Sequence, residues 1–217
     1  RVLSTLVLAP IRSTGWGVFR GGDNVSPKPM TPPYSTSPGL PQRILLTGAS
    51  GYVGGRLLMR LYNSNHSIRC MARRPDALRR RVGEGIEVVE GDVTDYESLL
   101  AALKDVSVAY YLVHSLASKG DLEEIERRGA ENFARAAREC GVERIIYLGG
   151  LADADAQRSP HMRSRLAVGE ILRSSSVPTI EFRASIIVGA GSLSFDLIRS
   201  LVTKLPIMTV PSWVRVT

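Results

Sequence analysis

The stretch "LLTGASGYVGGRLLMRL", residues 45–61, joins an apolar run to a helix-like pattern through closely spaced glycines. Residues 43–47 read as a buried strand, and the leucines after the glycines recur at helical spacing. Gly48, Gly51 and Gly54 permit a tight turn and let the backbone approach a ligand closely. Because the first N–H groups of a helix and the positive end of its dipole favour an anion, the turn predicts a pyrophosphate cradle. The alternative is a tight strand-to-helix turn that binds no ligand.

After Gln42, apolar runs and helical patterns alternate regularly. Strands are predicted at 43–47, 67–72, 86–89, 107–113, 144–149 and 179–186. Helices are predicted at 52–63, 75–82, 95–104, 121–139, 160–175 and 193–204. This alternation predicts an α/β fold, a doubly wound parallel sheet with helices on both faces. Ligands of such sheets bind beyond the carboxyl ends of the strands, where the glycine turn lies, which favours the cradle over the empty turn.

The first 41 residues differ in composition from the rest because they are rich in proline, serine and threonine. We expect no packed structure there. The segment is interpreted as a disordered tail or, since it carries arginines and one acid, as a targeting segment that resembles a transit peptide. Residues 42–217 are expected to form one domain, truncated at its C-terminus. No apolar run is long enough for a membrane span.

The net charge of +7 is distributed along the chain, with the arginine-rich segments interleaved with acids. These segments are interpreted as solvated surfaces, so nucleic acid is not expected as a partner. Cys70 and Cys140 do not make a disulfide framework in a chain of this length. The three histidines are dispersed and no cysteine has ligand-like spacing, so no metal site is expected.

Arg73 and Arg74 follow the second predicted strand, whose end contacts the adenosine ribose in dinucleotide-binding sheets. An acid there would bind a free 2′-hydroxyl, whereas a guanidinium suits a 2′-phosphate. The pair therefore favours NADP(H) over NAD(H), the alternative being two solvated arginines at a strand end. Asp92, after the third predicted strand, is expected either to receive the adenine amino group or to cap helix 95–104.

Several segments resemble, in order, those of atypical and extended short-chain dehydrogenases/reductases, in particular the NmrA-like relatives of nucleoside-diphosphate-sugar epimerases: "TGASGYVG", "VEGDVTD", "YYLVHS" and "SPHMRSRLAVGEILRSSSVP". The resemblance implies a Rossmann-type NAD(P)-binding domain whose C-terminal part holds the substrate. It also implies a reducing compartment, expected to be the cytoplasm, or an organelle if residues 1–41 are a transit peptide.

The same resemblance assigns residues to the parts of the dinucleotide. Those at the pyrophosphate are Gly48, Ser50, Gly51, Tyr52, Val53 and Gly54, and those at the 2′-phosphate are Arg73 and Arg74. Those at the adenine are Asp92 and Val93, and those at the nicotinamide ribose are Leu112, Val113 and His114. Arg183, Ala184 and Ser185 would contact cofactor or substrate.

Active members of this family carry Tyr-x-x-x-Lys on the helix after the fifth strand, where the lysine lowers the pKa of the tyrosine so that its hydroxyl transfers a proton. This sequence has His161 and Arg165 at those positions, and Gly149-Gly150 in place of the usual serine or threonine. An arginine can bind ribose hydroxyls but cannot shuttle a proton, whereas a histidine titrates near neutrality. His114, His161 and Arg165 are therefore the catalytic candidates, and each also has a purely structural interpretation.

Two functions follow from these residues. The first is an NADP(H)-dependent oxidoreductase or epimerase-like enzyme that acts on an unknown small molecule. The second is a catalytically inactive NADP(H) sensor of the NmrA-like type that acts through a protein partner, which the missing tyrosine and lysine favour. Both need the cofactor turn, so the turn does not decide between them.

Overall fold

The computed structural model describes residues 4–6, 41–113, 122–151, 160–184, 187, 189, 191–204 and 208–210. The chain divides into two compact units, one of residues 39–187 and one that combines residues 1–38 with 188–217. In the latter, β1 (Ser4–Leu6) pairs antiparallel with β8 (Met208–Val210), and α6 spans Leu193–Lys204. The sequence did not indicate the short β1–β8 pair.

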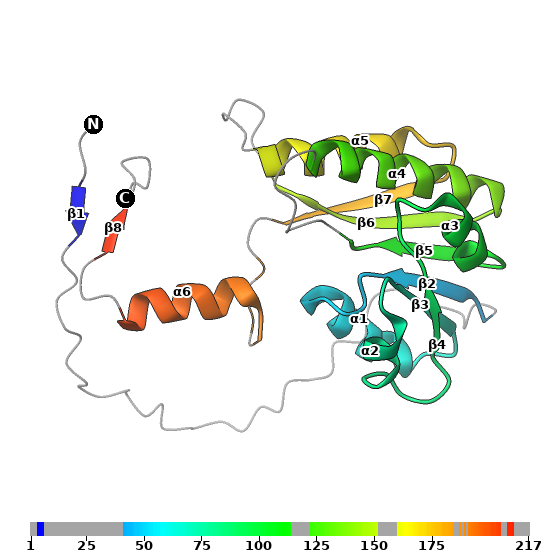
Figure 1. Ribbon diagram of the computed structural model, residues 1–217, viewed down its shortest axis with the longest axis horizontal. Coiled ribbons are helices and arrows are strands. Elements are labelled where there is room, and N and C mark those ends of the chain that lie inside the picture. The colour runs from blue at the N-terminus through cyan, green and yellow to red at the C-terminus, as the bar shows by residue number, and fades with distance from the viewer. Residues whose placement is uncertain are drawn as a thin grey trace, which may run out of the picture. The chain divides into compact units, whose positions relative to one another are not determined.

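A sheet of six parallel strands forms the centre of the unit of residues 39–187 (Figure 1). Their spatial order is β4 (Glu87–Glu90), β3 (Ser67–Ala72), β2 (Arg43–Thr47), β5 (Val108–Tyr111), β6 (Arg144–Gly150) and β7 (Thr179–Ala184). The chain runs outward from β2 to β4, returns to β5 beside β2, and then continues to β7. The order therefore reverses between β2 and β5, and such a switch point is where dinucleotides bind in this type of sheet.

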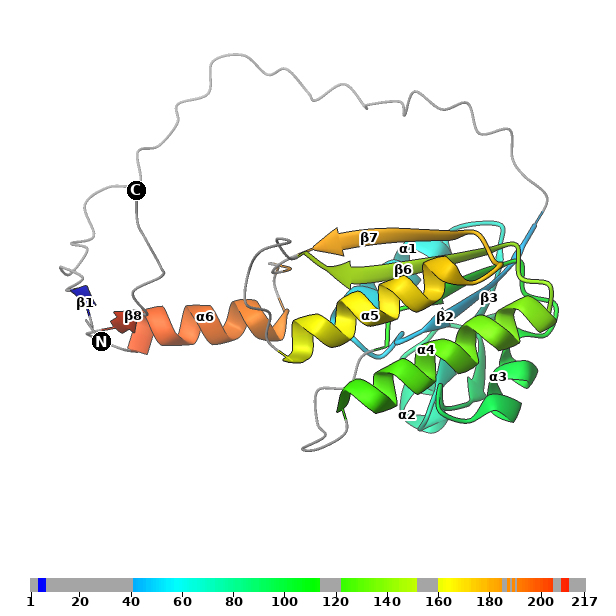
Figure 2. The same ribbon diagram turned by 90° about the horizontal axis from the view of Figure 1, so that it is seen from above.

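Helices cover both faces of this sheet, as Figures 1 and 2 show. One face packs against α1 (Tyr52–Tyr62) and α2 (Pro75–Arg79), and the other against α3 (Tyr96–Leu103), α4 (Leu122–Glu139) and α5 (Pro160–Ser174). Because successive strand residues point to opposite faces, Leu45 packs with the α3–α5 layer and Leu46 with the α1–α2 layer. The predicted doubly wound, Rossmann-type α/β fold is confirmed.

The ends of β5 and α2 differ from the predicted ones. β5 ends at Tyr111 rather than at residue 113, because the N–H of Leu112 donates to the side-chain hydroxyl of Thr47 (3.1 Å) instead of continuing the ladder. α2 ends at Arg79, ahead of the predicted residue 82, and the chain continues as a turn toward Gly83. Neither difference moves the edge of the sheet that carries the glycine turn.

Candidate functional site

The turn after β2 leaves no room for a side chain at Gly48 or at Gly54. Gly48 has a φ of +73°, in the left-handed region that favours glycine, and a Cβ there would lie 2.7 Å from the carbonyl oxygen of Leu112. A Cβ at Gly54 would lie 2.2 Å from the carbonyl oxygen of Gly48. The N–H of Gly51 closes the turn by donating to the same Gly48 oxygen at 3.0 Å. The predicted glycine pattern is thus a requirement of close backbone packing between β2, α1 and the end of β5.

The first turn of α1 presents its N–H groups at this switch point. Gly51 is the N-cap residue and supplies no side-chain cap, and the first turn contains no acidic residue. Ser50 is exposed, whereas Tyr52 and Val53 are half-buried beside the turn. Because initial helix N–H groups lack intrahelical partners and the helix dipole is positive here, the turn fits a pyrophosphate group.

Arg73 and Arg74 lie just beyond β3, the strand next to β2. Both side chains are exposed, and in the part of the chain that the structure describes neither has a hydrogen-bond or ion-pair partner. Since β2 and β3 are parallel, the two guanidinium groups share a sheet edge with the glycine turn. They fit a phosphate on the adenosine ribose.

Asp92 shapes the loop after β4. Its Oδ1 accepts hydrogen bonds from the N–H and the hydroxyl of Thr94, both at 2.8 Å. Of the two alternatives for Asp92, the helix cap is not observed, because Asp95 is the N-cap of α3 and its carboxylate accepts from two N–H groups of the first turn. The Asn132 amide of α4 donates to the carbonyl oxygens of Val93 (3.4 Å) and Thr94 (3.2 Å), which fixes this loop against the helix.

The end of β5 forms the other side of the switch point. Leu112 is half-buried, with its carbonyl oxygen against Gly48, and Val113 packs at the margin of the core on the α3–α5 face. His114, the predicted ribose contact and catalytic candidate, lies outside the described residues. The structure therefore brings Leu112 to the glycine turn, and its contact with the nicotinamide ribose stays a prediction.

α5 carries His161 and Arg165, the residues expected at the positions of a tyrosine and a lysine. The Arg165 guanidinium donates to the carbonyl oxygen of Leu148 near the end of β6, and lies 5.8 Å from the centre of the Tyr147 ring. His161 is half-buried one helical turn earlier, on the same face of α5. Arg165 and His161 thus lie near the carboxyl end of β6.

Two buried tyrosines, Tyr147 beside α5 and Tyr111 beside α4, are weak proton donors. Tyr147 donates its hydroxyl to the backbone carbonyl of Arg165 (2.9 Å), and burial raises its pKa. Burial likewise raises the pKa of Tyr111, whose ring packs edge-on against Phe133. This shift is opposite to the one that lysine produces in the Tyr-x-x-x-Lys pair. Neither tyrosine replaces the missing acid.

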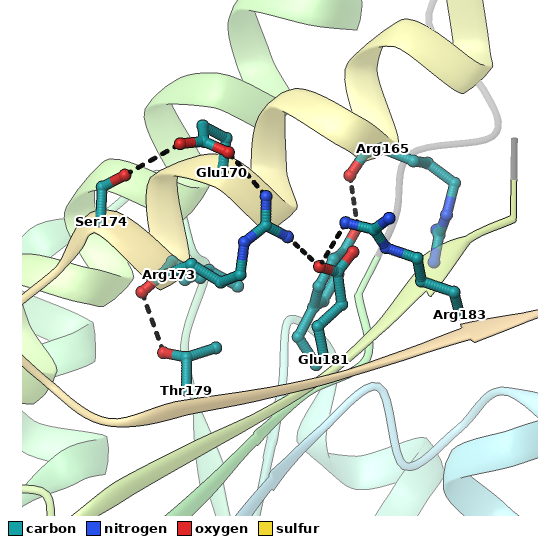
Figure 3. A network of polar contacts seen from close by, with 9 residues as sticks. Arg165, Glu170, Arg173, Ser174, Thr179, Glu181 and Arg183 are labelled. Atoms are coloured by element: carbon teal, nitrogen blue, oxygen red, sulfur yellow. Dashed lines mark hydrogen bonds and ion pairs between the residues drawn. The ribbon is translucent and has the colours of Figure 1, made fainter. Parts of the chain in front are cut away.

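A buried carboxylate that the sequence analysis did not single out lies between β6, β7 and α5 (Figure 3). The Glu181 side chain is only 6% exposed, and its Oε2 accepts from Arg173 of α5 and from Arg183 of β7 (3.1 Å). A Cβ would lie 2.5 Å from Oε1 of Glu181 at Gly149 and 2.7 Å at Gly169. The carboxylate thus fills space that two glycines leave. The sequence signal was an acid inside a predicted strand, but its neighbours come from distant segments.

Cys70 is buried in β3 and Cys140 is half-buried after α4, and both are free thiols. Within the described ranges, no three histidine, cysteine or acidic side chains are grouped so as to hold a metal ion. No helix in those ranges is long and apolar enough to cross a membrane.

Comparison with known proteins gives matches to dinucleotide-binding proteins. The model of a protein family described as NAD(P)H-binding matches residues 48–178. The chain is 32% identical over 136 residues to (4-alkanoyl-5-oxo-2,5-dihydrofuran-3-yl)methyl phosphate reductase of Streptomyces griseus, a match that covers 62% of this chain and 44% of the reductase. Each match to a curated relative spans less than half of that relative's length.

Two solved structures that this chain resembles contain a nicotinamide dinucleotide. The Citrobacter sp. triphenylmethane reductase complexed with NADP(H) is 26% identical, with a TM-score of 0.57 over 68% of this chain and 50% of that one. The Bordetella bronchiseptica enzyme WbmG in complex with NAD is 22% identical, with a TM-score of 0.63 over 77% of this chain and 62% of that one. The second likeness concerns the fold alone.

Proposed function

Because this chain belongs to the NAD(P)H-binding family of atypical short-chain dehydrogenases/reductases, we propose that it is an NADP(H)-dependent oxidoreductase or epimerase-like enzyme acting on a small molecule. The observation that carries the proposal is the turn at Gly48–Gly54, where tight backbone packing and an uncapped helix start fit a pyrophosphate. The S. griseus relative is named as a reductase, which supports reduction as the direction of the reaction.

The preference for NADP(H) rests on Arg73 and Arg74. Both are exposed at the end of β3, and neither is neutralised by an acid in the described part of the chain. The complex of the Citrobacter sp. reductase with NADP(H) supports the same choice. A planar guanidinium binds a phosphate through paired N–H groups, a contact that NAD(H) does not offer at the ribose.

When bound, the nicotinamide supplies the hydride. We propose that Arg165 holds hydroxyls of its ribose, since the guanidinium lies at the end of β6 and has donors besides the one on Leu148. His161 is the proposed proton donor on α5, and His114, outside the described residues, is the second candidate. Because the buried tyrosines are weak acids and arginine holds its proton, the acceptor is proposed to be readily reduced, such as a quinone.

A sensor that binds NADP(H) and acts through a protein partner is the second candidate. The replacement of tyrosine and lysine by His161 and Arg165 favours it, together with the hydrogen bond that ties Arg165 to the sheet. Such a protein needs the cofactor turn and no proton donor.

The two candidates are separated by measuring binding and turnover in the same preparation. NADPH affinity is measured by calorimetry, and NADPH oxidation is then followed by absorbance with quinones, aldehydes and sugar nucleotides. Turnover that is lost in His161→Ala and kept in His66→Ala supports the enzyme, because His66 precedes β3 at the opposite edge of the sheet. Tight binding without turnover supports the sensor. A folded chain that binds neither NADPH nor NADH contradicts both.

The proposed place of action is a reducing compartment, namely the cytoplasm, or an organelle if residues 1–41 are a transit peptide. The free thiols of Cys70 and Cys140 support a reducing environment.

A further inference from the structure

We propose that Arg183 binds an anionic group of the substrate, a phosphate or a carboxylate, and that the buried Glu181 holds its guanidinium in place. The inference rests on the proposed function, since it concerns a substrate held near the dinucleotide. Anion binding is nevertheless measurable independently of turnover.

Arg183 lies at the edge of the sheet where ligands bind. It stands near the carboxyl end of β7 and pairs in register with Gly149, near the carboxyl end of β6. Because all six strands are parallel, this edge is also the one that carries the glycine turn at the end of β2. Two strands, β5 and β6, lie between Arg183 and the switch point. A dinucleotide at the switch point therefore leaves the carboxyl end of β7 open to a second molecule beside it.

The Arg183 guanidinium is anchored but not saturated. One nitrogen donates to Oε2 of Glu181 at 3.1 Å, and 43% of the side chain is exposed. An arginine has five N–H donors, and those that remain on Arg183 have no protein partner among the residues described. A held guanidinium with free donors loses less conformational entropy on binding an anion than a solvated one.

Arg183 shares its acidic partner with a second arginine. Figure 3 shows the guanidinium groups of Arg173 and Arg183 on either side of the Glu181 carboxylate, with Glu170 on the other side of Arg173. Glu170 and Glu181 both bind Arg173, whereas Arg165 donates to a backbone carbonyl and not to an acid. Glu181 therefore shares its carboxylate between Arg173 and Arg183, and Arg183 has no acid to itself among the described residues.

The cost of burying Glu181 argues against a merely structural ion pair. Its Oε1 is buried and has no hydrogen-bond partner among the described residues. An unsatisfied buried carboxylate oxygen is destabilising, and such costs are concentrated where function requires them. Gly149 and Gly169 leave the space for this carboxylate, so the backbone of two elements accommodates it. The buried Glu181 carboxylate holds the Arg183 guanidinium in place.

The test is a titration with inorganic phosphate of the whole chain saturated with NADPH, followed by calorimetry at constant ionic strength. Bound NADPH fills the glycine turn and the neighbourhood of Arg73 and Arg74, so any remaining phosphate site lies elsewhere. The variants are Arg183→Gln, Arg183→Lys and, as the matched control, Arg144→Gln. Arg144 is an exposed arginine at the opposite end of the neighbouring strand β6. Each variant is first checked for an unchanged thermal unfolding transition.

Phosphate affinity is expected to fall at least about tenfold in Arg183→Gln, less in Arg183→Lys, and not at all in Arg144→Gln. A parallel titration is made with acetate. If acetate affinities fall in the same order among the variants, the Arg183 site binds carboxylates as well as phosphate; if only phosphate binds, the substrate group is a phosphate. Equal affinities in Arg183→Gln and Arg144→Gln, or no phosphate binding at all, would overturn the proposal. Failure of NADPH to bind counts against the proposed function alone, because the comparison of the two glutamine variants then proceeds without NADPH.

Discussion

Thr47 and Leu112 are joined across the switch point by a hydrogen bond of 3.1 Å from the Leu112 N–H to the Thr47 hydroxyl. The same hydroxyl donates to the carbonyl oxygen of Tyr110 at 2.8 Å, and Thr47 is completely buried. The Thr47 side chain thus satisfies two backbone groups, the carbonyl of Tyr110 in β5 and the N–H of Leu112 just after it. It also fixes Leu112 at the position where its carbonyl oxygen meets Gly48.

Replacing Thr47 by Val should destabilise the fold by about 1–3 kcal/mol, because the Leu112 N–H and the Tyr110 carbonyl lose their shared partner. The free energy of unfolding in urea measures the effect. Thr47→Ser keeps the hydroxyl and is expected to retain more of the stability. Equal stability of the Val and Ser variants would show that the hydroxyl does not hold the switch point together.

Gly54→Ala and Gly55→Ala form a matched pair of neighbours in α1. A Cβ at Gly54 meets the Gly48 carbonyl oxygen at 2.2 Å, whereas one at Gly55 has only an ordinary contact at 3.4 Å. Gly54→Ala is therefore expected to displace the turn and weaken NADPH binding at least tenfold, or about 1.4 kcal/mol. Gly55→Ala should keep binding and gain up to about 1 kcal/mol of helix stability. Calorimetric titration with NADPH tests both, and similar losses in the two variants would contradict the cradle geometry.

The double variant Arg73→Ala/Arg74→Ala should lose NADPH affinity by about tenfold or more while NADH affinity changes little, because only NADPH carries the 2′-phosphate. Arg80→Ala/Arg81→Ala is the control, since it removes two exposed arginines of equal charge after α2. The ratio of the two dinucleotide affinities is the quantity to compare. An unchanged ratio in the first variant would refute the NADP(H) assignment.

Cys70 gives the stability of the fold a pH dependence. Burial raises the pKa of its thiol from the usual 9.0 to about 12. Between these values the unfolded chain loses a proton that the folded chain keeps, so stability falls as the pH rises. The loss is at most about 1.4 kcal/mol per pH unit. Urea unfolding at pH 9 and pH 10 should show this slope in the unmodified chain and a shallower one in Cys70→Ala, and identical slopes would contradict it.

The elements of the fold were predictable because their signals are local. The apolar runs of β2 and β3 and the amphipathic spacing of α1 are read within a single segment, and the predicted ends agree with the structure except at the last residue of α1. The end of β5 was not predictable, because it depends on the hydroxyl of Thr47, which is distant in sequence.

The same distinction explains the site. The glycine turn was identified because its three glycines and the helix start are contiguous, and Arg73 and Arg74 because they follow a strand directly. The environment of Glu181 was not identified from the sequence, since it combines Gly149, Gly169 and two arginines from separate elements. The catalytic roles of His161 and His114 stay predictions.

The place of Glu181 also restricts how the chain can change over evolutionary time. A side chain at Gly149, one of the two glycines at the expected serine or threonine position, would place its Cβ 2.5 Å from Oε1 of Glu181. A side chain at Gly149 therefore requires the Glu181 carboxylate to shift, and that shift disturbs its contact with Arg183. Positions 149 and 181 lie on neighbouring strands and share this space, so the effects of substituting both are not expected to be the sum of the two single effects.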